Sequence, residues 1–151
     1  MYKISKIILP TDLSRFSLTA FDYAKDIAEQ YEAEIYMVYV LEKAPPLVML
    51  QNSNGKSKMT QAEYEEKVKK EFNSVLGQLQ DSTNSIVKGI IRKGDDSDEI
   101  ISFSNEIKAD MIILSTHSRT GFLRSVLGSV ADKVIQNARC PILVIPPIEE
   151  E

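Results

Sequence analysis

Small polar and basic residues follow an apolar run near the carboxyl end of this chain. The run covers residues 110–114, and after it come Ser115, the polar segment 116–121, and then Gly128 and Ser129, which open a predicted helix. This order places backbone N–H groups and the positive end of a helix dipole beside the carboxyl end of a strand. Open α/β sheets hold anionic ligands, phosphates above all, at such places. The segment therefore predicts a phosphate-binding site.

The rest of the chain predicts the elements that position this segment. Short apolar or β-branched runs, typical of buried strands in parallel sheets, occupy residues 6–10, 34–41, 86–91, 110–114 and 141–146. Apolar residues at three- and four-residue steps predict helices over most of 17–31, after the capping box at 60–63, after Asp96 and over 128–137. Right-handed crossovers then give a parallel sheet with helices on both faces. We expect one doubly wound, Rossmann-like α/β domain over residues 1–151, with five parallel strands in the order 3-2-1-4-5 and four helices.

Local signals also predict helix caps and buried helix faces. Ser14 or Ser17 can cap the first helix, and Asp96 together with Glu99 has the spacing of a cap for the third. The residues expected on the buried side of the last helix are Val130, Val134 and Ile135.

Four loops meet where the strands of such a sheet end. They carry Pro10, Thr11 and Asp12 after the first strand, Val40 at the end of the second, Gly94 after the third and residues 115–129 after the fourth. This mixture suits a nucleotide, because it offers apolar residues for a base, a carboxylate for a ribose hydroxyl or base amine, and N–H groups with hydroxyls for phosphate.

Each part of this constellation also has an ordinary structural explanation. Asp12 can cap the first helix, and Gly94 can serve a turn with positive φ. Gly128 and Ser129 can start a helix without binding anything, and Arg119 can be a solvated surface residue. Only the convergence of these residues at one end of the sheet favours a binding site.

The sequence lacks the common signatures of enzymes and metal sites. It contains no GxxxxGK[ST] phosphate loop and no GxGxxG after the first strand. The only histidine is His117, in the phosphate-side loop, so the chain offers no set of nucleophile, base and orienting residue. No His, Cys and carboxylate cluster has metal-ligand spacing, and Asp12 would help hold Mg²⁺ only where a nucleotide carries it. The sequence therefore favours a protein that is not an enzyme, with slow ATP hydrolysis as the alternative.

Composition and charge favour a cytoplasmic protein without nucleic-acid or membrane partners. The net charge is -4, both signs are scattered along the chain, and no basic stripe dominates. Cys140 is the only cysteine, which excludes an intramolecular disulfide framework. No apolar run reaches membrane-spanning length, and the first residues lack the apolar region of a signal peptide. Residues 43–59 predict a flexible loop, and residues 147–151 an acidic tail.

Several segments together resemble the universal stress protein family, in order and over essentially the whole chain. They are residues 7–12, Gly94, and residues 115–121, 127–134 and 140–145. The resemblance implies the adenine nucleotide alpha hydrolase-like form of the doubly wound fold. It also implies a cytoplasmic regulator of the stress response that binds an adenine nucleotide.

The ATP-binding members of that family carry the motif G-x2-G-x9-G-[ST] after the fourth strand. In this chain the final pair is Gly128-Ser129, separated by nine residues from Ser118, but both leading glycines are replaced, by Ser115 and Ser118. A Cβ at these positions can obstruct the approach of the backbone to a phosphate. Serine is the mildest replacement, because it is small and its hydroxyl can bond a phosphate oxygen.

The resemblance implies ATP as the ligand, with AMP and ADP as alternatives, and Mg²⁺ where a triphosphate binds. It places the triphosphate near Ser115, Ser118, Gly128 and Ser129, the ribose near Asp12 and the adenine near Val40 and Gly94. The full expected nucleotide-binding set is Pro10, Thr11, Asp12, Val40, Gly94, Ser115, His117, Ser118, Arg119, Gly128, Ser129 and Val130. Because two glycines are replaced, the alternative function is a dimeric interaction module of the same family with a vestigial pocket.

The resemblance further implies a homodimer through the fifth strand, where Ile142 to Ile145 form an apolar edge. Long apolar edge strands are seldom left bare. The alternative is that the N-terminal or C-terminal segment covers this strand. The sequence identifies no client protein.

Overall fold

The computed structural model of the protein describes residues 1–42, 59–116 and 128–146. Five strands and four helices alternate along these segments. The strands are β1 (Lys6–Pro10), β2 (Glu34–Leu41), β3 (Val87–Lys93), β4 (Met111–Ser115) and β5 (Ile142–Ile145). The helices are α1 (Arg15–Tyr31), α2 (Gln61–Asp81), α3 (Asp96–Ile107) and α4 (Ser129–Asn137).

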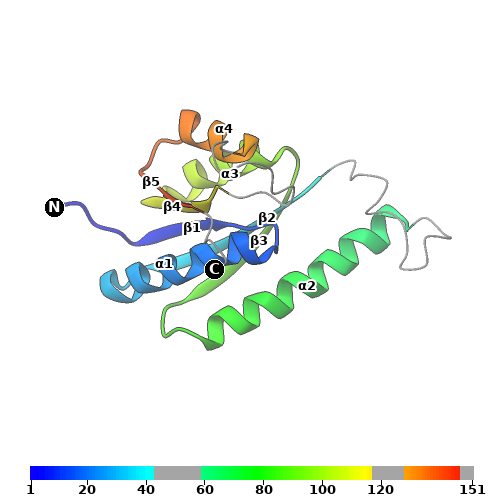
Figure 1. Ribbon diagram of the computed structural model, residues 1–151, viewed down its shortest axis with the longest axis horizontal. Coiled ribbons are helices and arrows are strands. Elements are labelled where there is room, and N and C mark those ends of the chain that lie inside the picture. Colours follow the sequence, from blue (N-terminus) through cyan, green and yellow to red (C-terminus); the bar gives the residue numbers. More distant parts are fainter. Residues whose placement is uncertain (43–58, 117–127, 147–151) are drawn as a thin grey trace.

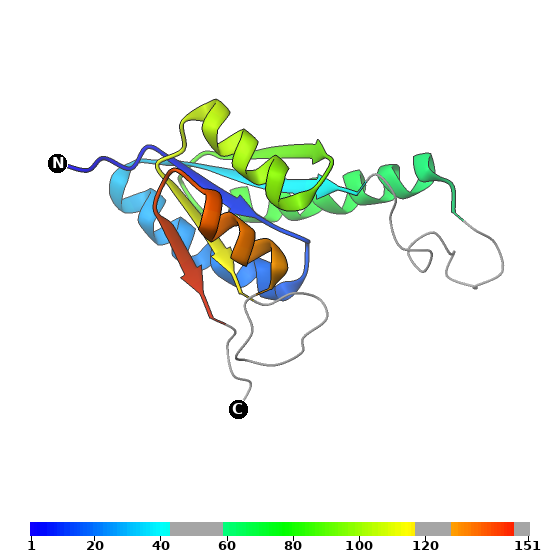
Figure 2. The same cartoon turned by 90° about the horizontal axis from the view of Figure 1, so that it is seen from above.

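The five strands form one sheet in the order β3-β2-β1-β4-β5. Every pair of neighbouring strands is parallel. Helices α1 and α2 cover one face of the sheet, and α3 and α4 cover the other (Figure 1). Figure 2 shows the molecule from the side of α3 and α4. The predicted doubly wound fold and its strand order are thus confirmed.

The central strand β1 is buried on both faces, because side chains alternate between the two faces along a strand. Ile7 and Leu9 join the apolar cluster under α1, whereas Ile8 joins the cluster under α3 and α4. None of the three side chains is exposed to solvent. The continuous apolar run that predicts this strand therefore reflects two covered faces rather than one.

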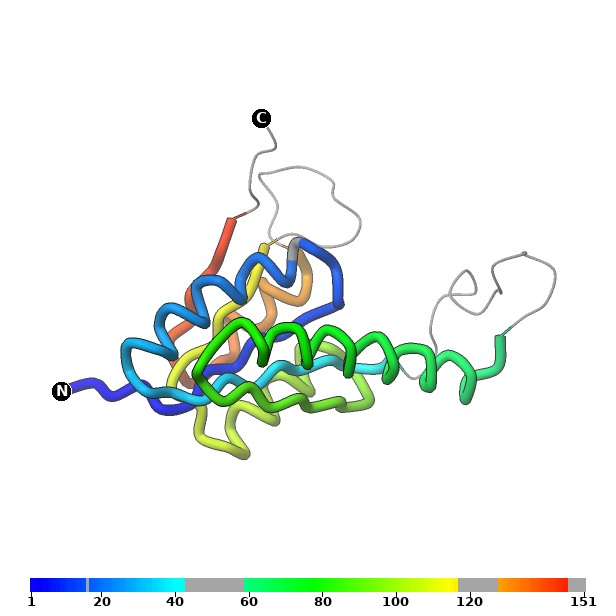
Figure 3. Tube along the Cα trace, turned by 90° about the horizontal axis from the view of Figure 1, so that it is seen from below, coloured from blue at the N-terminus to red at the C-terminus, as the bar shows by residue number. Residues whose placement is uncertain are grey.

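Helix α2 packs over the edge strand β3 and its neighbour β2. Its amino-terminal end extends beyond the ends of the strands (Figure 3). The third apolar cluster lies beneath it and consists of Met37, Tyr39, Leu41, Tyr64, Val68 and Phe72. At the carboxyl end of β3, the ammonium group of Lys93 lies 2.6 Å from a carboxylate oxygen of Glu65 in α2.

The structure selects one of the two predicted caps for α1 and confirms the capping box of α2. The hydroxyl oxygen of Ser14 accepts a hydrogen bond from the Ser17 N–H, so α1 starts at Arg15, two residues earlier than predicted. In α2, the Thr60 side chain accepts from the Glu63 N–H, and the Glu63 side chain accepts from the Thr60 N–H.

The predicted cap of α3 is wrong by one residue. Asp95, not Asp96, has the extended backbone of an N-cap (φ −79°, ψ 131°), and its carboxylate accepts the Asp98 N–H at 3.1 Å. Asp96 is the first residue of the helix itself, directly after the cap. Two neighbouring aspartates allow either register, because both can cap, and only the packed position of the helix decides between them.

The structure corrects two further details. Ile135 in α4 is 40% exposed, whereas Val134 is fully buried, because the buried face of this short helix is narrower than the sequence indicates. Ile86, predicted as the first residue of the third strand, lies outside β3 and is 52% exposed.

Two predicted segments lie wholly or almost wholly outside the described residues: the loop at 43–59, of which only Met59 is described, and the tail at 147–151. Among the helices that the structure describes, none is both long enough and apolar enough to cross a membrane.

Candidate functional site

The helices that follow β1 and β4 leave the sheet in opposite directions. These two strands are neighbours at the centre of the sheet. The chain turns from β1 into α1 on one face, and α4, the helix after β4, lies on the other face (Figure 1). In a doubly wound sheet such a divergence opens a crevice at the carboxyl ends of the strands. The predicted site residues belong to the loops around this crevice.

The loop between β1 and α1 is held by a compact set of hydrogen bonds. Thr11 is buried, and its hydroxyl lies 2.8 Å from the hydroxyl of Ser17 and accepts the Leu13 N–H. Asp12 does not cap α1, because its carboxylate accepts the N–H of Ser14, which is itself the cap. Leu13 has a positive φ of 66°, an unfavourable conformation for a side chain of this size. The loop therefore fixes the position of Asp12 at the edge of the crevice.

A pocket of about 300 Å³ lies beside this crevice, between the carboxyl ends of β2 and β3 and the first turns of α3 and α4. Its lining residues are Glu42, Gly94, Asp95, Asp96, Ser97, Ser129, Val130 and Lys133. Three of the predicted nucleotide-binding residues share one cavity, and Gly94 is far in the sequence from the other two, Ser129 and Val130.

Gly94 occupies a position that other residues would not tolerate. Its φ is +151°, and a Cβ added there would lie 2.9 Å from a carboxylate oxygen of Glu99. Its N–H donates to the carbonyl oxygen of Leu41 at 3.0 Å, which joins the ends of β2 and β3. Gly94 therefore both forms the positive-φ turn and lines the pocket.

The amino-terminal turn of α4 faces the same pocket. Its N-cap is Gly128, which supplies no side chain to accept from the N–H groups of this turn. The positive end of the helix dipole and these N–H groups attract an anion placed at Ser129. Lys133, one turn further along α4, adds a positive charge to the lining.

Negative charge dominates the rest of the lining. Burial raises the pKa of the half-buried Asp96 carboxyl, and repulsion from Glu42, Asp95 and Asp12 raises it further. The pKa of the Asp95 carboxyl is lowered instead. Hydrogen bonds from the Asp98 N–H and the Ser97 hydroxyl lower it, and nearby Lys133 lowers it further. Asp12 does not line the pocket, but its charge contributes to the raised pKa of Asp96.

The remaining predicted site residues divide into three groups. Val40 is half-buried and packs against the same apolar cluster as Val130. Pro10 and Ser115 end the neighbouring strands β1 and β4, without lining the pocket. His117, Ser118 and Arg119 lie outside the described residues.

Sequence reasoning missed five residues of the pocket as site residues: Glu42, Asp95, Asp96, Ser97 and Lys133. A signal existed for some of them. Glu42 directly follows the second strand, as Asp12 closely follows the first, and Lys133 lies four residues after Ser129 and hence on the same helix face. For Asp96 the sequence indicates only a helix cap.

The carboxylates near the pocket are oxygen ligands of the type that Mg²⁺ prefers. Among the described residues, however, no group of three or more His, Cys, Asp or Glu side chains lies close enough together to hold a metal ion.

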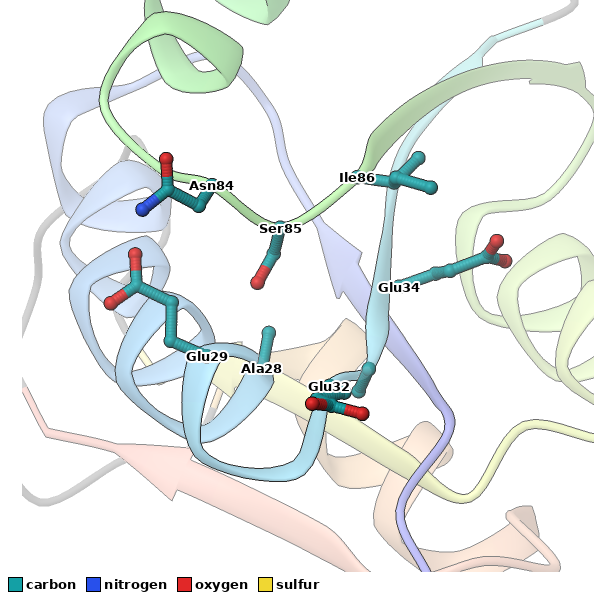
Figure 4. A pocket seen from close by; sticks show the side chains of 8 residues that line it. Ala28, Glu29, Glu32, Glu34, Asn84, Ser85 and Ile86 are labelled. Carbon is teal, nitrogen blue, oxygen red and sulfur yellow. The ribbon is translucent and has the colours of Figure 1, made fainter.

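A second pocket, of about 350 Å³, lies at the opposite end of the sheet, between the end of α1 and the turn before β3 (Figure 4). Glu29, Glu32 and Glu34 are among its lining residues, although the Glu34 side chain points away from the others (Figure 4). Glu32 caps the carboxyl end of α1, which carries the negative end of the helix dipole. Glu34 is paired with Lys88, and Glu29 accepts a hydrogen bond from Thr83. Negative charges and a negative dipole end make this pocket unsuitable for a phosphate.

Known proteins resemble the chain in both sequence and structure. The family model described as "Universal stress protein family" matches residues 3–146. The universal stress protein MJ0531 of Methanocaldococcus jannaschii is 33% identical over 100% of this chain and 86% of its own length.

Solved structures share the fold over nearly the whole chain. The structure of the hypothetical protein MJ0577 has a TM-score of 0.76 at 25% identity and covers 99% of both chains. A universal stress protein in complex with cAMP has a TM-score of 0.71 at 16% identity, covering 95% of this chain and 98% of its own. The universal stress protein from Archaeoglobus fulgidus in complex with dAMP has a TM-score of 0.67 at 18% identity, covering 96% and 99%. At these last two identities the likeness concerns the fold.

Proposed function

This chain belongs to the universal stress protein family, and on that premise we propose that it binds an adenine nucleotide at the carboxyl ends of its strands. One observation carries the proposal: Gly94, which follows β3, lines a single pocket together with Ser129 and Val130, the first two residues of α4. The amino-terminal turn of α4 offers N–H groups and a positive dipole end to a phosphate.

Solved proteins of the same fold support an adenine nucleotide as the ligand class. Structures in complex with cAMP, dAMP and AMP share the fold of this chain. For this chain we propose ATP, with AMP and ADP as alternatives, and with Mg²⁺ carried by the nucleotide when a triphosphate binds. The phosphates lie at Gly128 and Ser129, the ribose at Asp12, and the adenine between Val40 and Gly94.

The remaining residues of the proposed set complete this site. Pro10 and Thr11 support Asp12 from the end of β1, because the Thr11 N–H donates to the carbonyl oxygen of Val38 and its hydroxyl fixes the loop. Val130 contributes to the wall of the pocket. Ser115, His117, Ser118 and Arg119 provide further donors on the phosphate side. The biological role that follows is that of a cytoplasmic regulator of the stress response, which senses or carries the nucleotide.

Two measurements on the purified protein test nucleotide binding. Denaturation should release an adenine nucleotide that mass spectrometry identifies, or calorimetry of the nucleotide-free protein should show binding of ATP with Mg²⁺. Replacing Asp12 by alanine should weaken that binding about tenfold or more, because a ribose contact in a partly desolvated site is lost. No co-purified nucleotide together with flat titrations of AMP, ADP and ATP would refute the proposal. Hydrolysis is a separate question, which a turnover assay on the same two proteins answers.

The second candidate function is a dimeric interaction module with a vestigial pocket. The observation in its favour is that serines occupy positions 115 and 118, where the ATP-binding motif has glycines. The double substitution Ser115→Gly and Ser118→Gly separates the two functions. Under this second function the double variant should gain or greatly strengthen ATP binding, whereas unchanged tight binding in both proteins supports the first.

We also propose a homodimer that forms through β5. The two edges of the sheet differ in character. The edge strand β3 carries Lys88, Arg92 and Lys93, and such charges discourage pairing with another strand. The opposite edge strand, β5, is entirely apolar, with the sequence Ile-Leu-Val-Ile. A second copy of the chain that pairs with β5 would bury this edge.

A further inference from the structure

Three carboxylates line the pocket in which we propose that the nucleotide binds. Glu42, Asp95 and Asp96 line it, and Asp12 lies close enough to Asp96 to raise the pKa of its carboxyl. Lys133 is the single basic residue among the lining residues that the structure describes. The described wall therefore carries an excess of negative charge, although it lies beside the positive end of a helix.

The charges of the wall come from two separate parts of the fold. Glu42 follows β2, and Asp95 and Asp96 lie at the start of α3. Burial and repulsion from Glu42 and Asp95 raise the pKa of the half-buried Asp96 carboxyl. Part of this charge is balanced locally, because the Asp95 carboxylate accepts hydrogen bonds from Ser97 and Asp98 and lies near Lys133.

We propose that this acidic wall, formed by Glu42, Asp95 and Asp96, is a specificity determinant that ranks nucleotides by their net negative charge. The inference rests on the proposed nucleotide function of the same pocket. One phosphate can occupy the positive end of α4 and approach Lys133, whereas each further phosphate charge meets the carboxylates. Cyclic AMP and AMP are therefore favoured over free ATP. A divalent cation bound to the triphosphate lowers its charge and restores ATP binding.

Calorimetric titrations at low ionic strength and neutral pH test this ranking. The ligands are cyclic AMP, AMP, ATP with EDTA and ATP with excess Mg²⁺. The variant Asp96→Asn removes one charge from the wall without changing its size. It should tighten the binding of free ATP roughly fivefold to tenfold, and that of AMP only about twofold, because Coulomb repulsion scales with the charge of the ligand. Added salt should reduce the difference by screening.

Asp98→Asn is the matched control. Asp98 lies in the same first turn of α3 and is exposed, but it does not line the pocket. The control should leave the ratio of the ATP and AMP affinities unchanged. Glu42→Gln provides a second variant on a different element and should act in the same direction as Asp96→Asn, so the test does not depend on one variant that folds poorly.

The possible results separate the inference from the function on which it rests. If the wall variants change the affinities of AMP and free ATP by the same factor, the acidic wall does not rank nucleotides and the inference is overturned, while nucleotide binding stands. If neither the wild-type protein nor any variant binds the four ligands, the proposed function and the inference fall together. A selective gain for free ATP in both wall variants, but not in Asp98→Asn, supports the inference.

Discussion

At the scale of single residues, the neighbours Asp95 and Asp96 show how strongly position decides chemistry. The Asp95 carboxylate caps α3 and is exposed, and its hydrogen bonds lower its pKa. The Asp96 carboxyl lies half-buried in the pocket, where burial and three nearby carboxylates raise its pKa. Both aspartates line the candidate pocket, but Asp95 also caps α3, whereas Asp96 is the half-buried one of the two.

Gly94→Ala tests the turn that brings the pocket together. The variant should lower the free energy of unfolding by about 1–3 kcal/mol, because its φ of +151° is accessible almost only to glycine. Urea denaturation monitored by circular dichroism measures the change. Gly77→Ala is the control: a Cβ there meets nothing within 4 Å inside α2, so it should stabilise the protein by roughly 0.5–1 kcal/mol.

The double variant Gly94→Ala with Glu99→Ala separates backbone strain from crowding. Removing the Glu99 side chain relieves the 2.9 Å contact but leaves the backbone conformation as it is. The free energy of unfolding of the double variant should therefore remain as low as that of Gly94→Ala. Full recovery in the double variant would contradict the assignment of the effect to φ.

At the scale of secondary-structure elements, the close approach of α2 to β3 depends on Gly89. An added Cβ at this position would lie 2.6 Å from Leu76 Cδ2 and 2.7 Å from Phe72 Cε1. Phe72 is only 2% exposed and belongs to the apolar cluster beneath α2. The smallest residue in the strand therefore sets how closely the longest helix packs against the sheet.

Gly89→Ala should destabilise the protein by about 1–3 kcal/mol, because the added methyl group overpacks a filled interface. The thermal midpoint and the urea midpoint should both fall. The same chemical change at Gly77, on the exposed surface of the helix that Gly89 faces, should raise them. A Gly89→Ala protein as stable as the wild type would show that α2 can move away from β3 without cost.

At the scale of the whole molecule, the sheet has one charged edge and one apolar edge. The carbonyl oxygens of Pro141 and Ile145 accept hydrogen bonds from Ile112 and Thr116, on the side of β4. Since backbone groups alternate in direction along a strand, the N–H of Val144 points away from β4 toward the outer edge. This outward row of N–H and C=O groups is what a second copy of β5 would bind.

Val144→Pro should convert the proposed dimer into a monomer, because proline removes an outward N–H while the bonds to β4 stay intact. Light scattering coupled to size exclusion measures the mass of each protein. Leu143→Pro is the contrasting variant: its N–H points toward β4, so this change should destabilise the fold itself. A wild-type protein that is monomeric at all accessible concentrations would refute the dimer.

Much of the fold could be predicted from the sequence, because strand and helix periodicities are local. The apolar runs at β1 and β2 and the capping box before α2 were recognisable without any long-range information. The right-handedness of parallel crossovers then fixed the layers. Errors occurred where local signals were degenerate, as at Asp95 and Asp96, or where burial depended on neighbouring helices, as at Ile135.

Local patterns in the sequence predict the order of the elements, the family and the loops that could bind a ligand. Which side chains share the pocket depends on how distant segments pack together. Glu42, Asp96 and Lys133 come from three different parts of the chain, and no local pattern relates them. The charge of the pocket and the raised pKa of Asp96 follow from burial and from contacts between distant segments. These properties belong to the packed chain, and because of them the expected phosphate site has an acidic wall.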